Sequence, residues 1–105
     1  MIKTASEFFA LACLKRDKVE VRGQVVHIRE LSVAERGRVL EIGEKSRADL
    51  PAFLDATCAV TPDGAPLFTA EQAAEIAKAA PEVVDSVAAA IMRLSGLIEA
   101  DPKNA

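Results

Sequence analysis

The residues that most often carry catalysis are few and scattered in this chain of 105 residues. His27 is the only histidine, and a catalytic histidine needs a nucleophile and an orienting acid, which no pattern here marks. Ser95 lies outside any Gly-x-Ser-x-Gly motif, the turn that exposes the nucleophile of many hydrolases. We therefore expect His27 to be a cross-strand surface residue beside Glu20, and we expect no enzyme activity.

The sequence also lacks the spacing of a metal or phosphate site. Asp63 and Gly64 precede acidic residues, but the Asp-x-Asp-x-Asp-Gly pattern of a calcium loop and its glutamate at the twelfth position are missing. Cys13 and Cys58 lie far apart, with no Cys-x-x-Cys pair or Cys/His cluster that would bind zinc. The five glycines stand singly, which excludes a glycine-rich phosphate loop. We predict no metal and no cofactor.

Charge is unevenly distributed along the chain. Residues 1–47 hold 10 Lys/Arg and 7 Asp/Glu, or +3, whereas residues 48–105 hold 3 and 9, or −6, for the total of −3. Such asymmetry either orients docking, between copies or onto a charged partner, or reflects two differently solvated faces.

A moderately basic segment occupies the middle of the chain. The isoelectric point near 5.1 and the interleaved glutamates argue against nucleic acid as its partner. A solvated helix surface and a docking surface for an acidic protein stay open as alternatives. The basic residues are Arg29, Arg36, Arg38, Lys45 and Arg47.

The N-terminus, MIKTASEFFALACLKR, has a short apolar run broken by Glu7 and no convincing cleavage site, so it does not resemble a secretory signal. No apolar run reaches the roughly 18 residues of a membrane span. We expect a cytoplasmic protein with reduced thiols, built as one domain over residues 1–98 with a flexible tail over 99–105.

Three capping boxes predict three helix starts, because a Ser or Thr is followed three residues later by Glu or Gln. They are Thr4 to Glu7, Ser32 to Glu35 and Thr69 to Gln72. Pro51 and Pro81 favour the first turns of two more helices. The expected helices span about 5–15, 32–46, 51–58, 70–79 and 81–96.

Between the first two helices, the segment KVEVRGQVVHIRE alternates with period two and predicts a β-hairpin. We place Gly23-Gln24 at the turn, in a type II′ geometry that sets Val21 opposite Val26. The competing turn at Arg22-Gly23 would set Val21 opposite Gln24, and we disfavour it because it would mix the two faces. The core face then carries Val19, Val21, Val26 and Ile28.

A turn over residues 62–64 leads to Phe68, which directly precedes the Thr69 cap. An apolar residue in this position can pin the chain to the first turns of the helix, but the local partner, Ala73, is small. We therefore expect Phe68 to reach into the core between helices. The predicted structural residues are Gly23, Gly64, Phe68 and Thr69.

The last helix is apolar on nearly every side, so it needs burial on more than one side. The chain has 20 alanines and only four aromatic residues, which predicts a thin core that recruits help from another chain. Three uses stay open for this helix: the core of its own chain, the seam of a homo-oligomer, or a groove for a partner's amphipathic helix. The predicted partner- or oligomer-binding residues are Val84, Val87, Ile91 and Leu94, with Arg29, Arg36 and Arg38.

Three segments carry a resemblance to a known family. They are VHIRELSVAERGRV, TPDGAPLFTAEQAAEI and IMRLSGL, within residues 19–98. Together they resemble the small tail assembly chaperones of long-tailed bacteriophages, although residues 47–60 are less continuously apolar here. The matching residues are Arg29, Glu30, Leu31, Ser32, Glu35, Arg36, Asp63, Gly64, Pro66, Leu67, Phe68, Thr69, Leu94, Ser95, Gly96 and Leu97.

The resemblance implies a non-enzymatic protein of the host cytoplasm that coats the tape-measure protein, helps recruit tail tube subunits and is absent from the finished virion. From the residues themselves we expect a homo-oligomer, with no nucleic acid or membrane partner. The alternative is a small phage-encoded protein that binds and modulates a host protein. For the fold we predict an α+β domain, mainly α: an N-terminal helix, one β-hairpin, then about four helices.

Overall fold

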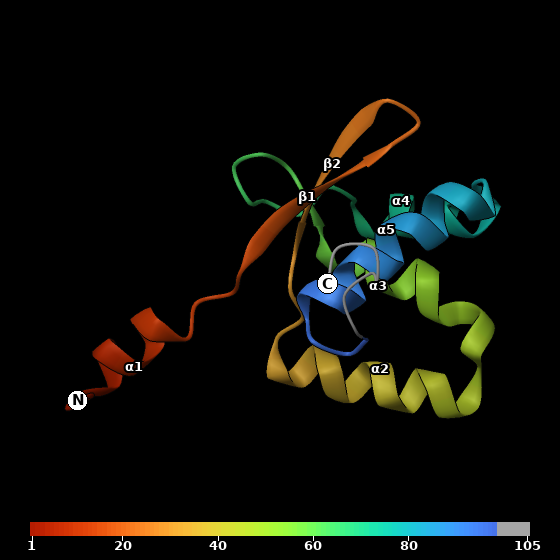
Figure 1. Cartoon of the computed structure of the whole chain (residues 1–105). Helices are drawn as coiled ribbons and strands as arrows, with labels where there is room; N and C mark the ends of the chain where they lie inside the picture. The colour runs from red at the N-terminus through yellow and green to blue at the C-terminus, as the bar shows by residue number, and fades with distance from the viewer. Residues whose placement is uncertain (99–105) are drawn as a thin grey trace.

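The computed structural model describes residues 1–98, so the predicted tail over 99–105 lies outside the described residues (Figure 1). A three-stranded antiparallel sheet of order β1-β2-β3 stands at its centre. Strand β1 (Arg16–Val21) pairs with β2 (Gln24–Arg29), and the short β3 (Ala59–Val60) pairs with β2 on its other side. Helix α5 (Pro81–Leu94) contacts both β1 and β2.

The remaining described helices surround this centre unequally. Helix α3 (Leu50–Cys58) packs on α5, and α2 (Val33–Lys45) contacts α3 and the 3-10 turn η1 (Arg47–Asp49). Helix α4 (Ala70–Glu75) runs into a second 3-10 turn, η2 (Ile76–Lys78), which contacts α3. Helix α1 (Ala5–Leu11) projects away from the body (Figure 1). The predicted class, α+β and mainly α with an N-terminal helix and a hairpin, is confirmed.

The first helix is shorter than predicted, because it ends at Leu11 instead of near Lys15. The backbone of Lys15 is bonded to Glu30, the residue after β2. The Lys15 carbonyl accepts from Glu30 N at 2.9 Å, and the Lys15 N–H donates to the side-chain Oε1 of Glu30 at 2.8 Å. These two bonds extend the β1–β2 ladder by one residue, so the chain must leave the helix before Lys15.

The predicted hairpin register was wrong. The turn residues are Arg22 and Gly23, with φ of 51° and 77°, and two successive positive φ angles define a type I′ turn. Val21 therefore lies opposite Gln24, and Val19 opposite Val26. Gly23 occupies the second central position, not the first, and His27 faces Lys18 instead of Glu20.

The predicted faces survive this error, because the true register differs by two residues and a two-residue shift returns each side chain to the same face. Mixing of the faces was therefore no reason to reject the turn at Arg22-Gly23. The apolar face is buried or half-buried, and the opposite face is more exposed. The apolar face carries Val19, Val21, Val26 and Ile28.

The core lies between this face of the hairpin and helices α3 and α5. Its largest fully enclosed side chains are Ile28, Leu54, Cys58 and Ile91. Val39 is the one α2 residue that is buried, so α2 adds little to the core. Among residues 1–98, no helix is long and apolar enough to cross a membrane.

The capping predictions are confirmed in full at two helices and in half at the third. Ser32 and Thr69 each form a complete capping box. Thr4 accepts from Glu7 N at 3.1 Å, but the Glu7 carboxylate accepts from Lys3 N and not from the cap.

Candidate partner-binding groove

Arg29 lies at the end of β2 and links three elements through its guanidinium group. Its two terminal nitrogens donate to the two carboxylate oxygens of Glu35 in the first turn of α2, at 2.7 and 2.9 Å. One of them also donates to the Thr57 carbonyl of α3 at 2.9 Å. Paired, two-pronged bonds of this kind are among the stronger polar contacts in proteins. We call the set Arg29, Glu35 and Thr57 the arginine anchor.

The charges of the anchor stabilise each other. The hydrogen bond from Arg29 lowers the pKa of Glu35 to about 2, against the opposing effect of burial. The same bond raises the pKa of Arg29. Both side chains are about one quarter exposed or less. The structure thus gives Arg29, a predicted partner-binding residue, an internal structural contact.

A second internal contact joins the start of α2 to the end of α5. The buried N–H of Leu31 donates to Ser95 Oγ at 2.9 Å, across 64 positions of sequence. Gly96 follows with φ of 74°, and Leu97 N donates to Met92 O at 2.9 Å, which together close the helix in a left-handed cap. Sequence reasoning considered Ser95 only as a nucleophile and missed this contact, although two of the resembling segments meet here.

The other two predicted arginines lie on the outer surface of α2. Arg36 is exposed, and Arg38 makes an exposed pair with Glu41 at 3.8 Å. Val33 and Leu40, one full heptad apart on the same helix face, are 90% and 65% exposed. Helix α2 therefore presents apolar and basic side chains to solvent together.

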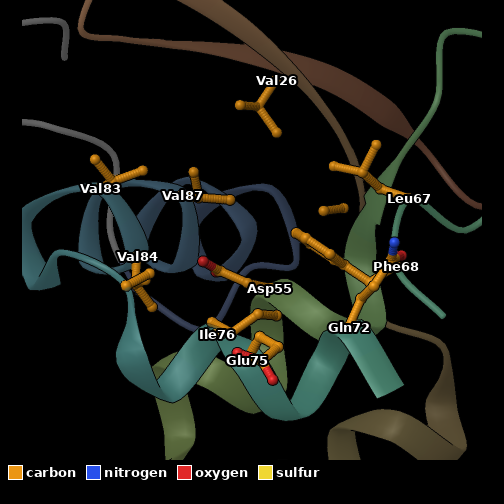
Figure 2. A pocket seen from close by; sticks show the side chains of 12 residues that line it. Val26, Asp55, Leu67, Phe68, Gln72, Glu75, Ile76, Val83, Val84 and Val87 are labelled. Carbon is orange, nitrogen blue, oxygen red and sulfur yellow. The ribbon is translucent and has the colours of Figure 1, made fainter. Parts of the chain in front are cut away.

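An apolar groove of about 570 Å³ lies beside α5 (Figure 2). Its walls come from β2, the end of α3, the segment before α4, the α4–η2 unit and the first half of α5. Three predicted site residues, Phe68, Val84 and Val87, share this wall although they come from different parts of the chain. The lining residues are Val26, Asp55, Ala59, Leu67, Phe68, Gln72, Glu75, Ile76, Ala79, Val83, Val84 and Val87.

Backbone pairing and a tight turn hold the Leu67-Phe68 wall in place. Leu67 N donates to Ala59 O at 3.0 Å beside β3. The preceding turn closes through Gly64 N and Thr61 O at 2.8 Å, with Gly64 at φ 92°. This φ lies in the left-handed region that side-chain-bearing residues rarely adopt, so the turn favours glycine at position 64.

Phe68 therefore lies half-buried in the groove wall and not in the fully enclosed core. The structural predictions for Thr69, as a cap, and for Gly64, as a turn residue, agree with their observed conformations. Of the predicted apolar stripe on α5, Val84, Val87 and Ile91 are 9%, 4% and 0% exposed, and Leu94 is half-buried. These side chains pack within their own chain, and Val84 and Val87 also border the groove.

Asp55 is the polar exception among the buried groove residues. It is 5% exposed, and its Oδ1 has no hydrogen-bond partner among the described residues. Figure 2 shows its carboxyl group between Val84, Val87 and Ile76. Burial, with a smaller effect from Asp85, raises its pKa to about 7. The groove thus contains a carboxyl group that its own chain leaves unsatisfied.

The Cys58 thiol lies buried at the end of α3. Burial raises the pKa of the Cys58 thiol to about 12, so it stays protonated at neutral pH. In the part of the chain that the structure describes, no three His, Cys, Asp or Glu side chains gather in a way that could hold a metal ion. The groove therefore combines a mainly apolar lining with one buried carboxylate oxygen, Asp55 Oδ1, that has no partner among the described residues.

Among solved structures, that of the bacteriophage HK97 tail assembly chaperone is similar, with a TM-score of 0.57 and 20% sequence identity. The match covers 91% of this chain and 96% of that chain. No family model and no curated protein matches the sequence. The resemblance indicated by the three segments is confirmed at the level of the fold.

Proposed function

We propose that this protein is a tail assembly chaperone that binds the tape-measure protein and helps recruit tail tube subunits. The observation that carries the proposal is the fold shared with the HK97 tail assembly chaperone across nearly the whole of both chains. In this role the protein works in the cytoplasm of the bacterial host, has no enzymatic activity and does not remain in the finished virion.

The outer face of α2 is the surface that we assign to the tape-measure protein. Val33 and Leu40 offer exposed apolar area, and Arg36, three and four positions from them on the same helix face, offers positive charge beside it. A chaperone that coats a long helical partner needs many modest contacts repeated by successive copies, because multivalency converts weak single contacts into stable coating. A mixed apolar and basic helix face suits an amphipathic helix with acidic residues.

Co-expression with fragments of the tape-measure protein tests the proposal. The wild-type chain should keep a fragment soluble and copurify with it, whereas Leu40→Asp combined with Arg36→Glu should reduce both by about tenfold. Val25→Asp, at an exposed position on the hairpin, is the matched control and should behave as wild type. A folded wild-type chain that neither binds nor solubilises any fragment would refute the function.

The same pull-down separates the alternative function. A protein that modulates the host would retain one host protein in a fixed ratio and leave the tape-measure fragments unbound. The chaperone proposal expects the reverse pattern, with tape-measure and tube proteins retained and no fixed host partner.

A further inference from the structure

Helix α1 projects away from the described body of the protein (Figure 1). All residues from 1 to 18 are exposed and none of its seven helical residues is buried. Three large apolar side chains on it are more than half exposed: Phe8 by 53%, Phe9 by 69% and Leu11 by 73%. The Phe8 and Phe9 rings pack edge to face, with their centroids 5.7 Å apart. We call residues 1–15 the N-terminal arm.

Such an arm is unstable unless something covers it. Isolated helices shorter than about 12 residues are marginal in water, because nucleation costs more than a few hydrogen bonds return. A contiguous group of exposed large apolar side chains marks an interaction site in a soluble protein. The arm therefore requires an apolar surface that its own body does not offer in this arrangement.

The groove offers an open apolar surface of the kind that the N-terminal arm lacks. It is lined mainly by apolar side chains, and Asp55 Oδ1 inside it has no donor among residues 1–98. Figure 1 places α1 and α4 on opposite sides of the molecule, and only residues 12–15 join α1 to β1. Four residues span at most about 14 Å. The arm of one chain is thus better placed to enter the groove of another chain than its own.

Charge favours the same pairing. Residues 1–18 hold four Lys/Arg and two Asp/Glu, or +2. The groove side, residues 69–85, holds one Lys and four Asp/Glu, or −3. Opposite net charges steer association and fix orientation, and salt weakens them.

We propose that the N-terminal arm of one copy docks in the α3–α4–α5 groove of the next copy, with Phe8 and Phe9 against the Phe68 wall. The contact is heterologous, since arm meets groove, so each copy keeps a free arm at one end and a free groove at the other. Repetition builds an open chain of copies. The inference stands on the arm and the groove alone and does not depend on the proposed function.

Light scattering over a concentration series tests the contact with full-length protein. Wild type should gain mass with concentration and lose it in high salt. Phe8→Asp with Phe9→Asp should weaken association by about tenfold or more without unfolding, because those side chains contact nothing in their own body. Leu67→Asp at the groove rim should do the same, and Ala79→Arg serves if that variant fails to fold. Val25→Asp, at an exposed hairpin position, is the control and should associate as wild type.

Mixing the two defective proteins is the decisive step. The arm variant retains a groove and the groove variant retains an arm, so the mixture should form one-to-one heterodimers that grow no further. Three results would overturn the proposal: a wild-type chain that stays monomeric at every concentration, arm and groove variants that associate as strongly as wild type, or a mixture of the two variants that stays monomeric. Loss of tape-measure binding by the α2 variants, with self-association intact, would leave this inference standing.

Discussion

The arginine anchor lies at the end of β2, the groove borders the same strand at Val26, and the two sites treat buried charge in opposite ways. In the anchor, the guanidinium group of Arg29 and the carboxylate of Glu35 satisfy each other and the Thr57 carbonyl. In the groove, the carboxyl of Asp55 has an oxygen without a partner. The anchor is complete when the chain folds, whereas the groove is complete only when something else enters it.

The same contrast appears in how the two carboxyl groups titrate. Glu35 has its pKa lowered from 4.5 to about 2, so its contribution to stability is present above pH 4.5 and is lost as pH falls toward 2. Asp55 has its pKa raised from 3.8 to about 7. Its contribution to the stability of the fold is therefore most favourable below pH 3.8 and is lost as pH rises toward 7. One region gains stability as its carboxyl ionises, and the other loses it.

Ile91→Asp should have the largest effect and tests whether the floor beside the groove belongs to this chain. Ile91 is 0% exposed, and an unpaired charge there should remove the cooperative thermal transition altogether. Circular dichroism and light scattering together measure it. A variant that stays folded but has a lower mass would instead place Ile91 in a contact between two chains, and not in the core of one chain.

Arg29→Ala should lower the free energy of unfolding by about 3 kcal/mol, because it leaves the partly buried Glu35 carboxylate without its partner. Arg29→Lys should recover only part of this, since an ammonium group cannot form the two-pronged contact. Urea denaturation at pH 7 measures both, with the exposed Arg36→Ala as a control within about 0.5 kcal/mol of wild type. An equal effect at Arg36 would mean that the anchor is no more than surface charge.

Sequence patterns captured what depends on near neighbours along the chain. The caps at Ser32 and Thr69 use residues three positions apart, and the hairpin faces follow from strict alternation. The hairpin register could not be predicted, because both registers keep the same side chains on the same faces. The positive φ of Arg22 also has no signature in the sequence. Long-range partners escaped for the same reason, as the contact of Leu31 with Ser95 shows.

The sequence predicts neither the arginine anchor nor the complete groove, for different reasons. Arg29 was counted as surface charge, because its contact with Thr57 forms only when α3 packs beside β2. Asp55 was noted only as an interruption of an apolar stretch, because its burial depends on α5. The groove was predicted in pieces, through Phe68 and the stripe on α5, and only the fold brings those pieces into one wall.

Asp55→Asn should stabilise the protein at pH 8 by about 2 kcal/mol relative to its effect at pH 4. This is about half of what the full pKa shift gives at about 1.4 kcal/mol per unit, since solvent in the open groove screens the charge. Below pH 3.8 the wild-type carboxyl is neutral in both folded and unfolded chains, so the two proteins should then differ little. Denaturation curves across this pH range measure the difference. A flat difference from pH 4 to 8 would show that Asp55 is solvated and that the groove lacks a buried charge.

Ser95→Ala should have the smallest effect of the series, lowering the free energy of unfolding by about 1 kcal/mol. It tests whether the contact between Leu31 and Ser95, like the arginine anchor, is satisfied within the chain. The substitution leaves the buried N–H of Leu31 without an acceptor, and such a lost bond costs about 1–3 kcal/mol. Ser86→Ala is the matched control, because Ser86 only donates to the Glu82 carbonyl of its own helix at 2.7 Å. Urea denaturation should rank Ser95→Ala below Ser86→Ala in stability. Equal stabilities would mean that water replaces the hydroxyl at Leu31, and that the junction of α2 with α5 is as open to an outside partner as the groove is.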